Sequence, residues 1–266
     1  MLKPVSFRYG KGQRMRQMEL TSEAQGQIDM NVTIVYGTQR KSCTYNIAQS
    51  LVRNLGQAEI KEIFLPKDLP EFCVSCFKCF SDENASCTHD QYVQPLREKL
   101  VWADLIILTS PVYSFHVSGQ MKVFLDHFAN MWIVHRPEQN MFKKQGVVIA
   151  TASGPVFGQT LKEMKDSLDF WGVSNTYKLG CAVMNTDWKN VDEKIKKAIE
   201  KKTKRIAQKI CKKHRKITQK GSAHVSFRVR KWFEISRLMQ KYGRFNPPDV
   251  AYWEQKGWTK KVKPWK

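Results

Sequence analysis

The sequence lacks any long hydrophobic run. Its longest apolar stretches, such as 105–108 and 146–152, are as short as β-strands, whereas a membrane-spanning helix needs about 18 apolar residues. The basic residues near the start are not followed by the apolar segment of about 7–15 residues that a secretory signal needs. The 42% hydrophobic content argues against general disorder. These observations predict a folded, cytoplasmic protein.

Acidic residues are also scarce, with 24 Asp and Glu against 45 Lys and Arg, so the formal net charge is +21. The excess is uneven, because residues 189–266 contain 25 basic and 6 acidic residues, whereas residues 1–188 contain 20 and 18. A nucleic-acid-binding module more often carries its charge on the folded domain itself. The net charge is therefore a poor guide to the function of the main domain.

From Met30 onward, short apolar runs alternate with amphipathic stretches, which predicts an α/β fold with a parallel sheet covered on both faces. Residues 1–29 are then either a flexible extension or a segment that is not translated, with Met30 as the true start. We expect strands at 32–36, 58–65, 104–109, 146–151 and 177–184, and helices at 46–55, 91–102, 117–131, 159–171 and 190–216. This pattern fits a three-layer, doubly wound domain over 30–217. Ligands bind such sheets at the carboxyl ends of the strands, which places the candidate loops at 37–45, 66–90, 110–117 and 152–158.

The first of these loops contains neither of two common nucleotide-binding motifs. It matches neither the phosphate loop of ATP and GTP enzymes nor the glycine pattern of dinucleotide-binding turns. Hydroxyls, backbone N–H groups and Arg40 at the start of a helix can instead bind a single phosphate monoester such as that of FMN. The alternative is an ordinary capped helix start, with Arg40 and Lys41 facing solvent.

The loop after the third strand carries a more specific pattern. It reads Ser-Pro-Val-Tyr at 110–113, and a helix with the pattern x-Lys-x-Phe-x-Asp follows at 121–126. With the Arg-Lys-Ser-x-Thr-Tyr-Asn-Ile-Ala run of the first loop, it resembles the NAD(P)H-dependent FMN reductase branch of the flavodoxin-like flavoproteins, over about residues 30–215. The resemblance implies a flavodoxin-like sheet of five parallel strands in the order 2-1-3-4-5.

The resemblance also implies an FMN-dependent oxidoreductase, active as a homodimer, that takes hydride from NAD(P)H and passes electrons to a small-molecule or protein acceptor. His116 is a candidate proton donor or substrate-orienting group beside the flavin, and the alternative is a loop histidine without a catalytic part. The residues implied to hold the phosphate are Thr38, Arg40, Ser42, Thr44 and Tyr45, and those implied to hold the ring are Pro111, Val112, Tyr113, Ser153 and Gly154.

Four of the seven cysteines fall within 15 residues in the loop after the second strand, as Cys73, Cys76, Cys79 and Cys87. Without an export signal, disulfides are disfavoured, and thiolates at this spacing commonly hold a metal. The segment resembles the compact cysteine motif of iron–sulfur flavoproteins, which implies a [4Fe–4S] cluster. Structural zinc and free thiols remain alternatives. The next acidic residue, Asp90, is predicted to cap the following helix.

Residues 218–266 lack the strand–helix alternation and interleave aromatic residues with Lys and Arg. Such a tail can contact nucleic acid, an anionic membrane or a second subunit. We favour packing against the domain or a dimer contact, with the tryptophans buried. Three functions are therefore considered: an FMN oxidoreductase, an iron–sulfur flavoprotein electron carrier, and a non-catalytic scaffold whose tail binds nucleic acid or membrane. The two motifs at strand ends favour the enzyme.

Overall fold

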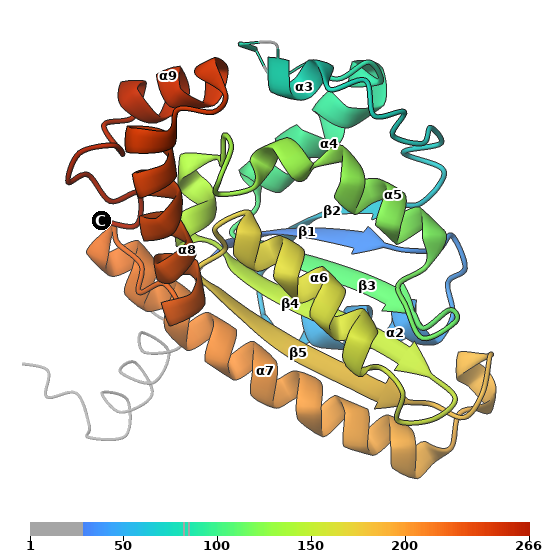
Figure 1. Ribbon diagram of the computed structural model, residues 1–266. Helices are drawn as coiled ribbons and strands as arrows, with labels where there is room; N and C mark the ends of the chain where they lie inside the picture. Colours follow the sequence, from blue (N-terminus) through green and yellow to red (C-terminus); the bar gives the residue numbers. More distant parts are fainter. Residues whose placement is uncertain (1–28, 82, 85) are drawn as a thin grey trace, which may run out of the picture.

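The computed structural model describes residues 29–81, 83–84 and 86–266, so the predictions about residues 1–28 lie outside the described chain. A sheet of five parallel strands forms its centre, in the order β2-β1-β3-β4-β5 (Figure 1). The strands are β1 (Met30–Tyr36), β2 (Ala58–Phe64), β3 (Leu105–Pro111), β4 (Gln145–Ala152) and β5 (Asn175–Ala182). The predicted fold class and strand order are confirmed. The central strands are apolar almost throughout because helices cover both of their faces.

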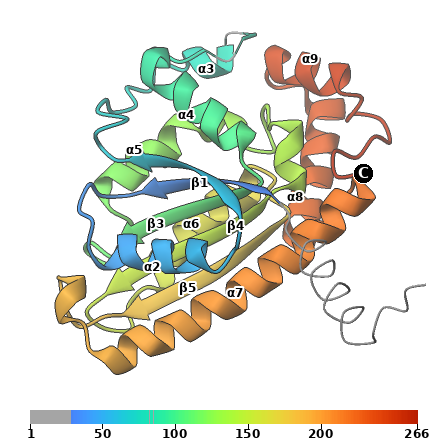
Figure 2. The ribbon, with the colours of Figure 1, turned by 180° about the vertical axis from the view of Figure 1, so that it is seen from behind.

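Helices cover the sheet in two layers, and Figure 2 shows the layer that contains α2 in front of the strands. One layer consists of α2 (Cys43–Arg53) and α7 (Glu193–Lys220), and the other of α4 (Asp90–Trp102), α5 (Gly119–His127) and α6 (Gly158–Phe170). The shorter elements are α3 (Lys78–Ser81), the 3-10 helices η1 (Ala129–Met131), η2 (Gln139–Lys143) and η3 (Trp188–Asn190), and the π-helical turn η4 (Met239–Gly243). The helix expected at 117–131 starts later, at Gly119, because the Ser118 hydroxyl caps α5 by accepting a hydrogen bond from the backbone N–H of Met121 at 3.3 Å. It ends earlier, at His127, and a separate 3-10 turn follows.

The C-terminal tail folds back on the end of the sheet from which the strands start (Figure 1). It forms α8 (Phe227–Leu238) and α9 (Pro247–Gln255). Its three buried tryptophans pack with Phe233 of α8 and with Phe142 of the main domain; they are Trp253, Trp258 and Trp265. The tail therefore shares an apolar cluster with the domain, as favoured from the sequence.

Much of the positive charge lies where α7 meets the tail. A cleft of about 620 Å³ opens there, and seven lysine and arginine side chains line it: Lys209, Lys212, Lys213, Lys216, Lys220, Arg230 and Lys266. The apolar face of α7 lies instead against the sheet through residues such as Ile199 and Ile210. Within the described chain, no helix combines the length and the apolar character that crossing a membrane requires.

Candidate functional site

A cavity of about 190 Å³ lies at the carboxyl ends of the strands. The segments that follow β1, β3, β4 and β5 contribute to its walls, as the fold predicts. Its lining residues are Thr38, Arg40, Ser42, Cys43, Thr44, Pro111, Val112, Tyr113, Thr151, Ala152, Ser153, Val183, Asn185 and Thr186. Most of the residues predicted to bind the cofactor are therefore brought together.

Gly37 lets the loop after β1 cross closely over the end of β3. Its N–H donates to the carbonyl of Thr109 at 2.8 Å, and its carbonyl accepts from the Ser118 hydroxyl at 2.6 Å. A Cβ at this position would lie 2.7 Å from the Ser118 oxygen and 2.9 Å from the Thr109 carbonyl oxygen. Any side chain at position 37 would therefore push the loop after β1 away from the end of β3 and from Ser118.

The first turn of α2 is built to accept an anion. Ser42 precedes the helix but does not cap it, because its hydroxyl donates to the carbonyl of Thr186 at 2.7 Å. The first turn contains no acidic residue, so neither a side-chain cap nor a carboxylate offsets the partial positive charge of this helix end. Arg40 adds a full positive charge beside it. The arrangement favours a phosphate group and disagrees with the alternative of an ordinary capped start.

The opposite wall of the cavity is apolar and formed by the segment after β3. Val112 is held by its N–H, which donates to the carbonyl of Thr151 at 2.9 Å. Tyr113 and His116 exchange two backbone hydrogen bonds, and Ser114 and Phe115 between them have left-handed φ angles of 50° and 68°. This tight turn leaves the Tyr113 and Phe115 side chains 52% and 65% exposed. Aromatic and aliphatic surface is thus available in the same cavity as Arg40 and the first turn of α2.

Three residues predicted for this site lie outside the lining of the cavity. The Tyr45 ring packs against Tyr36 with ring centroids 5.2 Å apart, and Gly154 is not among the lining residues. His116 points its Nδ1 to Glu163, 2.6 Å from a carboxylate oxygen. Partial burial raises the pKa of Glu163, but hydrogen bonds from His116, Gln159 and the Val117 N–H outweigh it and lower this pKa overall.

Sequence reasoning missed the contribution of the segment after β5. Asn185 and Thr186 line the cavity and also hold its first loop, since the Asn185 carbonyl contacts the Cys43 sulfur at 3.5 Å and the Thr186 carbonyl accepts from Ser42. The available signal was a run of polar residues directly after an apolar strand. Thr151, near the end of β4, was also missed, and its hydroxyl is hydrogen-bonded to the Thr44 hydroxyl at 2.7 Å.

A second cavity, of about 320 Å³, lies beside α3 and the end of α5. All four clustered cysteines line it, and the remaining lining residues are Val74, Ser75, Phe77, Phe80, Thr88, His89, Asp126, His127 and Ala129. None of the four cysteines is in a disulfide. The structure thus brings together the thiols that the sequence predicted to act as one metal site.

The environments of the four thiols differ. Burial, followed by the neighbouring sulfur of Cys87, raises the pKa of Cys79 to about 11. Burial also raises the pKa of Cys87, whereas a hydrogen bond with the Thr88 hydroxyl at 3.0 Å lowers the pKa of Cys76. The raised values mean that a metal binding here displaces protons from Cys79 and Cys87.

Arg136 fixes the backbone of the cysteine segment from inside the protein. This arginine is 2% exposed, and its guanidinium donates to the carbonyls of Cys79 at 2.6 Å, Phe80 at 3.1 Å and Glu83 at 3.1 Å. A charged donor that serves three carbonyls holds the segment more firmly than neutral contacts would. Arg136 is therefore a positioning residue for the cysteine cavity, and no motif or periodicity in the sequence pointed to it.

The C-terminal tail holds Arg136 in turn. Asp249 of α9 is 1% exposed and lies 3.0 Å from the Arg136 Nε and 2.8 Å from the His135 Nδ1. Asn246 of the tail donates directly to the carbonyl of Phe80 at 3.1 Å. The cysteine cavity therefore depends on contacts from two distant parts of the chain, one around Arg136 and one at the start of α9.

Asp90 does not cap α4 as predicted. It is the first residue of the helix, and His89 occupies the capping position without a side-chain cap hydrogen bond. The Asp90 carboxylate instead accepts from the backbone N–H of Cys87 at 3.4 Å. The prediction was wrong because the carboxylate serves the end of the cysteine segment.

Two proteins with similar sequences are named iron–sulfur flavoproteins. An iron–sulfur flavoprotein of Archaeoglobus fulgidus is 25% identical over 200 residues, which cover 75% of this chain and 84% of the relative. An iron–sulfur flavoprotein of Methanocaldococcus jannaschii is 30% identical over 100 residues, which cover 36% of this chain and only 50% of the relative.

Solved structures share the fold at low identity. The NAD(P)H:quinone oxidoreductase from Methanothermobacter marburgensis is 15% identical with a TM-score of 0.54, over 68% of this chain and 96% of that chain. An azoreductase from Bacillus anthracis is 11% identical with a TM-score of 0.53, over 68% and 99%. These likenesses confirm the predicted flavodoxin-like fold.

The sequence model described as NADPH-dependent FMN reductase matches residues 30–196, which is more than half of the chain. The matched region contains the two loop motifs that line the first cavity, after β1 and after β3, and all four cysteines that line the second. The match confirms the family predicted from the two loop motifs and, with it, FMN as the cofactor and FMN oxidoreductase as the enzyme class. The chain belongs to the NADPH-dependent FMN reductase family.

Proposed function

We propose that this protein binds FMN in the cavity at the strand ends, takes hydride from NAD(P)H and passes the electrons to a small-molecule or protein acceptor. The observation that carries the proposal is the pairing, in one cavity, of an uncapped helix start beside Arg40 with an apolar wall at Pro111, Val112 and Tyr113. When bound, FMN accepts two electrons as hydride and releases them singly or as a pair.

Different residues of the cavity then bind different parts of the cofactor. Arg40, the Thr38 hydroxyl and the N–H groups of the first turn of α2 bind the phosphate. Pro111, Val112 and Tyr113 pack against the ring and exclude water from one of its faces. Ser153 contributes from the loop after β4. We assign no role to His116, because it lies outside the lining of the cavity.

The test is FMN titration of the flavin-free protein, followed by flavin fluorescence, and then anaerobic reduction of the complex by NADH and by NADPH. Arg40→Gln removes a charge-assisted interaction of about 1.5–3 kcal/mol, so we expect the Kd for FMN to rise about 10- to 100-fold. Arg53→Gln, at the far end of the same helix and exposed, is the matched control and should bind FMN like the wild type. A wild-type protein that binds no FMN, or a complex that neither nucleotide reduces, would contradict the proposal.

We further propose that the four clustered cysteines hold a [4Fe–4S] cluster, which supplies single electrons when bound. Support comes from the four thiols around one cavity with apolar walls at Val74, Phe77 and Phe80. Iron and acid-labile sulfide assays on anaerobically purified protein test this. Cys79→Ser should lose both elements, whereas Cys211→Ser, a cysteine outside the cavity, should keep them. Zinc without sulfide in the wild type would favour the structural-zinc alternative.

We also propose that the protein acts as a homodimer whose interface lies over the mouth of the flavin cavity. Four large apolar side chains near the strand ends are exposed: Tyr113, Phe115, Val156 and Met184. Light scattering after gel filtration should give twice the chain mass, and Phe115→Asp should shift it to the monomer. Phe227→Asp replaces a phenylalanine on the tail that is even more exposed, and it should leave the dimer intact. A monomeric wild type would exclude this assembly.

A further inference from the structure

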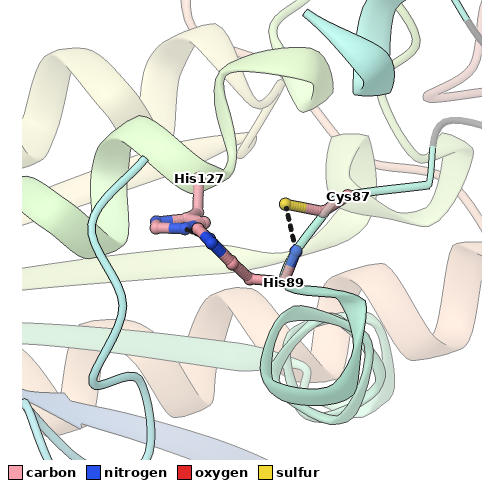
Figure 3. Close-up of side chains that lie close together, drawn as sticks. All are labelled: Cys87, His89 and His127. Carbon is pink, nitrogen blue, oxygen red and sulfur yellow. Dashed lines mark hydrogen bonds between the residues drawn. The ribbon is translucent and has the colours of Figure 1, made fainter. Parts of the chain in front are cut away.

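A second set of metal-binding atoms lies at the edge of the cysteine cavity. The Cys87 sulfur and one ring nitrogen each from His89 and His127 all lie within 4.8 Å of one another (Figure 3). Cys87 and His89 stand just before α4, and His127 ends α5. The cysteine motif accounts for Cys87 alone, and the flavin proposal uses none of the three. We propose that Cys87, His89 and His127 form a mononuclear site for Zn²⁺, filled when Cys87 is not bound to a cluster.

The ring of His127 is already oriented as a metal ligand. Its Nδ1 lies 2.9 Å from the carbonyl oxygen of Val123, which can only accept, so Nδ1 carries the proton and the neutral ring keeps a lone pair on Nε2. Metal-binding histidines are commonly held by such a bond from the other ring nitrogen to a carbonyl. The residue is 4% exposed, so packing fixes the direction of this lone pair.

His89 completes a pair of nitrogens at the spacing that Zn²⁺ requires. Its Nδ1 lies 3.1 Å from the His127 Nε2, and Figure 3 shows the two rings pointing at each other. With Zn–N bonds of about 2.0–2.1 Å, two nitrogens of a tetrahedral site lie about 3.3 Å apart. Zn²⁺ can therefore take the place of the bridging hydrogen, which moves to Nε2 of His89 as that ring adopts its other neutral tautomer. The rings need to separate by a few tenths of an ångström and tilt so that both lone pairs converge on the ion.

The sulfur of Cys87 lies on the same side and supplies the third ligand. The backbone N–H of His89 donates to this sulfur at 3.4 Å, which keeps the thiol next to the histidine pair. A rotation of the Cys87 side chain then brings the sulfur to bonding distance. One thiolate and two imidazoles are a ligand set that suits zinc. The fourth position opens into the cysteine cavity, where a water molecule can bind.

Cys87 belongs to both ligand sets, so the mononuclear site and the four-cysteine cluster exclude each other. The same loop then holds either a cluster or a zinc ion, according to which metal reaches it. The inference goes beyond the proposed function because it involves neither FMN nor the nucleotide. The proposed site also differs from a structural zinc ion bound by the four clustered cysteines, because Cys73, Cys76 and Cys79 are not ligands of it.

The experiment is titration of the reduced, cluster-free, full-length protein with Co²⁺, which reports tetrahedral sites by visible absorption and thiolate ligands by near-ultraviolet charge transfer. We expect one Co²⁺ per chain, displaced by one Zn²⁺. His127→Leu removes a ligand and should weaken Zn²⁺ binding by more than about 100-fold, the upper range for losing only a supporting partner. His89→Gln should weaken it in the same way, and its half-buried position before α4 makes a folding defect easier to avoid.

Cys73→Ser is the matched control, because Cys73 lines the same cavity but lies outside the three ligands. It should keep Co²⁺ and Zn²⁺ binding and lose the iron and sulfide of the cluster, whereas both histidine variants should keep them. Wild type that binds no Co²⁺, or wild-type affinity in both histidine variants, overturns the proposal, as does loss of Co²⁺ binding in Cys73→Ser. Co²⁺ binding to cluster-loaded protein overturns the exclusion. FMN content reports separately on the flavin proposal.

Discussion

The two cavities of this protein are built in different ways. The flavin cavity consists of segments that leave neighbouring strands of one sheet, so the sheet itself places its residues. The cysteine cavity lies on a segment with little regular structure, and its backbone is fixed by Arg136, which Asp249 of the tail holds in turn. All lining residues of the first cavity therefore lie within the matched family region, whereas the second cavity is also held in place by contacts from the C-terminal tail.

Asp249→Ala tests this difference with the largest expected effect. The variant leaves the buried guanidinium of Arg136 without its carboxylate, and breaking a buried ion pair from one side costs about 3–5 kcal/mol. We expect the free energy of unfolding in urea to fall by that amount, and iron content to fall with it, while FMN binding persists in the folded fraction. The matched control on the same helix is Glu254→Ala, whose exposed pair with Arg244 should contribute less than about 1 kcal/mol. Equal loss of FMN and iron would show that the two cavities depend on the tail alike.

Gly37→Ala should have the opposite effect, with weaker FMN binding and unchanged iron content. The added methyl group meets the Ser118 oxygen and the backbone of Thr109, and such overpacking typically costs about 1–3 kcal/mol. FMN affinity, measured by fluorescence titration, should therefore fall while iron content stays at the wild-type level. Gly154→Ala is the control, because a Cβ there meets no atom within 4 Å. Loss of iron in Gly37→Ala would mean that the cavities are mechanically coupled.

Glu163→Gln should give the smallest effect and should change with pH. The folded protein lowers the pKa of Glu163 below 4.5, so the charged carboxylate adds stability at pH values above 4.5 and this contribution disappears as the pH falls through the lowered pKa. At pH 7 we expect the variant to be less stable by under about 1 kcal/mol, since the pair with His116 is partly exposed. The two thermal stability curves should meet in acid. Glu98→Gln, at an exposed position of α4, should show no pH-dependent difference.

The parts of the structure that the sequence predicted are those with local signals. The alternation of strands and helices predicted the layers, and the two loop motifs predicted a set of residues most of which line one cavity. The directions of the Thr44 and Tyr45 side chains depend on the helix period, which the motif alone does not show. Successive residues on a helix point about 100° apart, so Thr44 faces the cavity and Tyr45 packs against Tyr36. The motif includes both residues, but only Thr44 lines the cavity.

Apart from the polar residues after β5, the missed parts have no local signal. Arg136 and Asp249 are 113 positions apart, and charged residues in a basic protein look like surface residues until exposed fractions of only 2% and 1% show otherwise. His127 similarly lies within an ordinary amphipathic stretch, and only the fold brings it to 3.1 Å from His89. These residues act through contacts between distant segments, which periodicity and spacing cannot report.

The lysine-lined cleft between α7 and the tail has a consequence for the whole molecule. With 25 basic and 6 acidic residues in 189–266 and near balance elsewhere, the protein is a large electric dipole. Long-range attraction acts before any contact forms and is weakened by salt. Near any negatively charged body, the molecule will therefore rotate until α7 and the tail face it, and raising the ionic strength will return it to random tumbling.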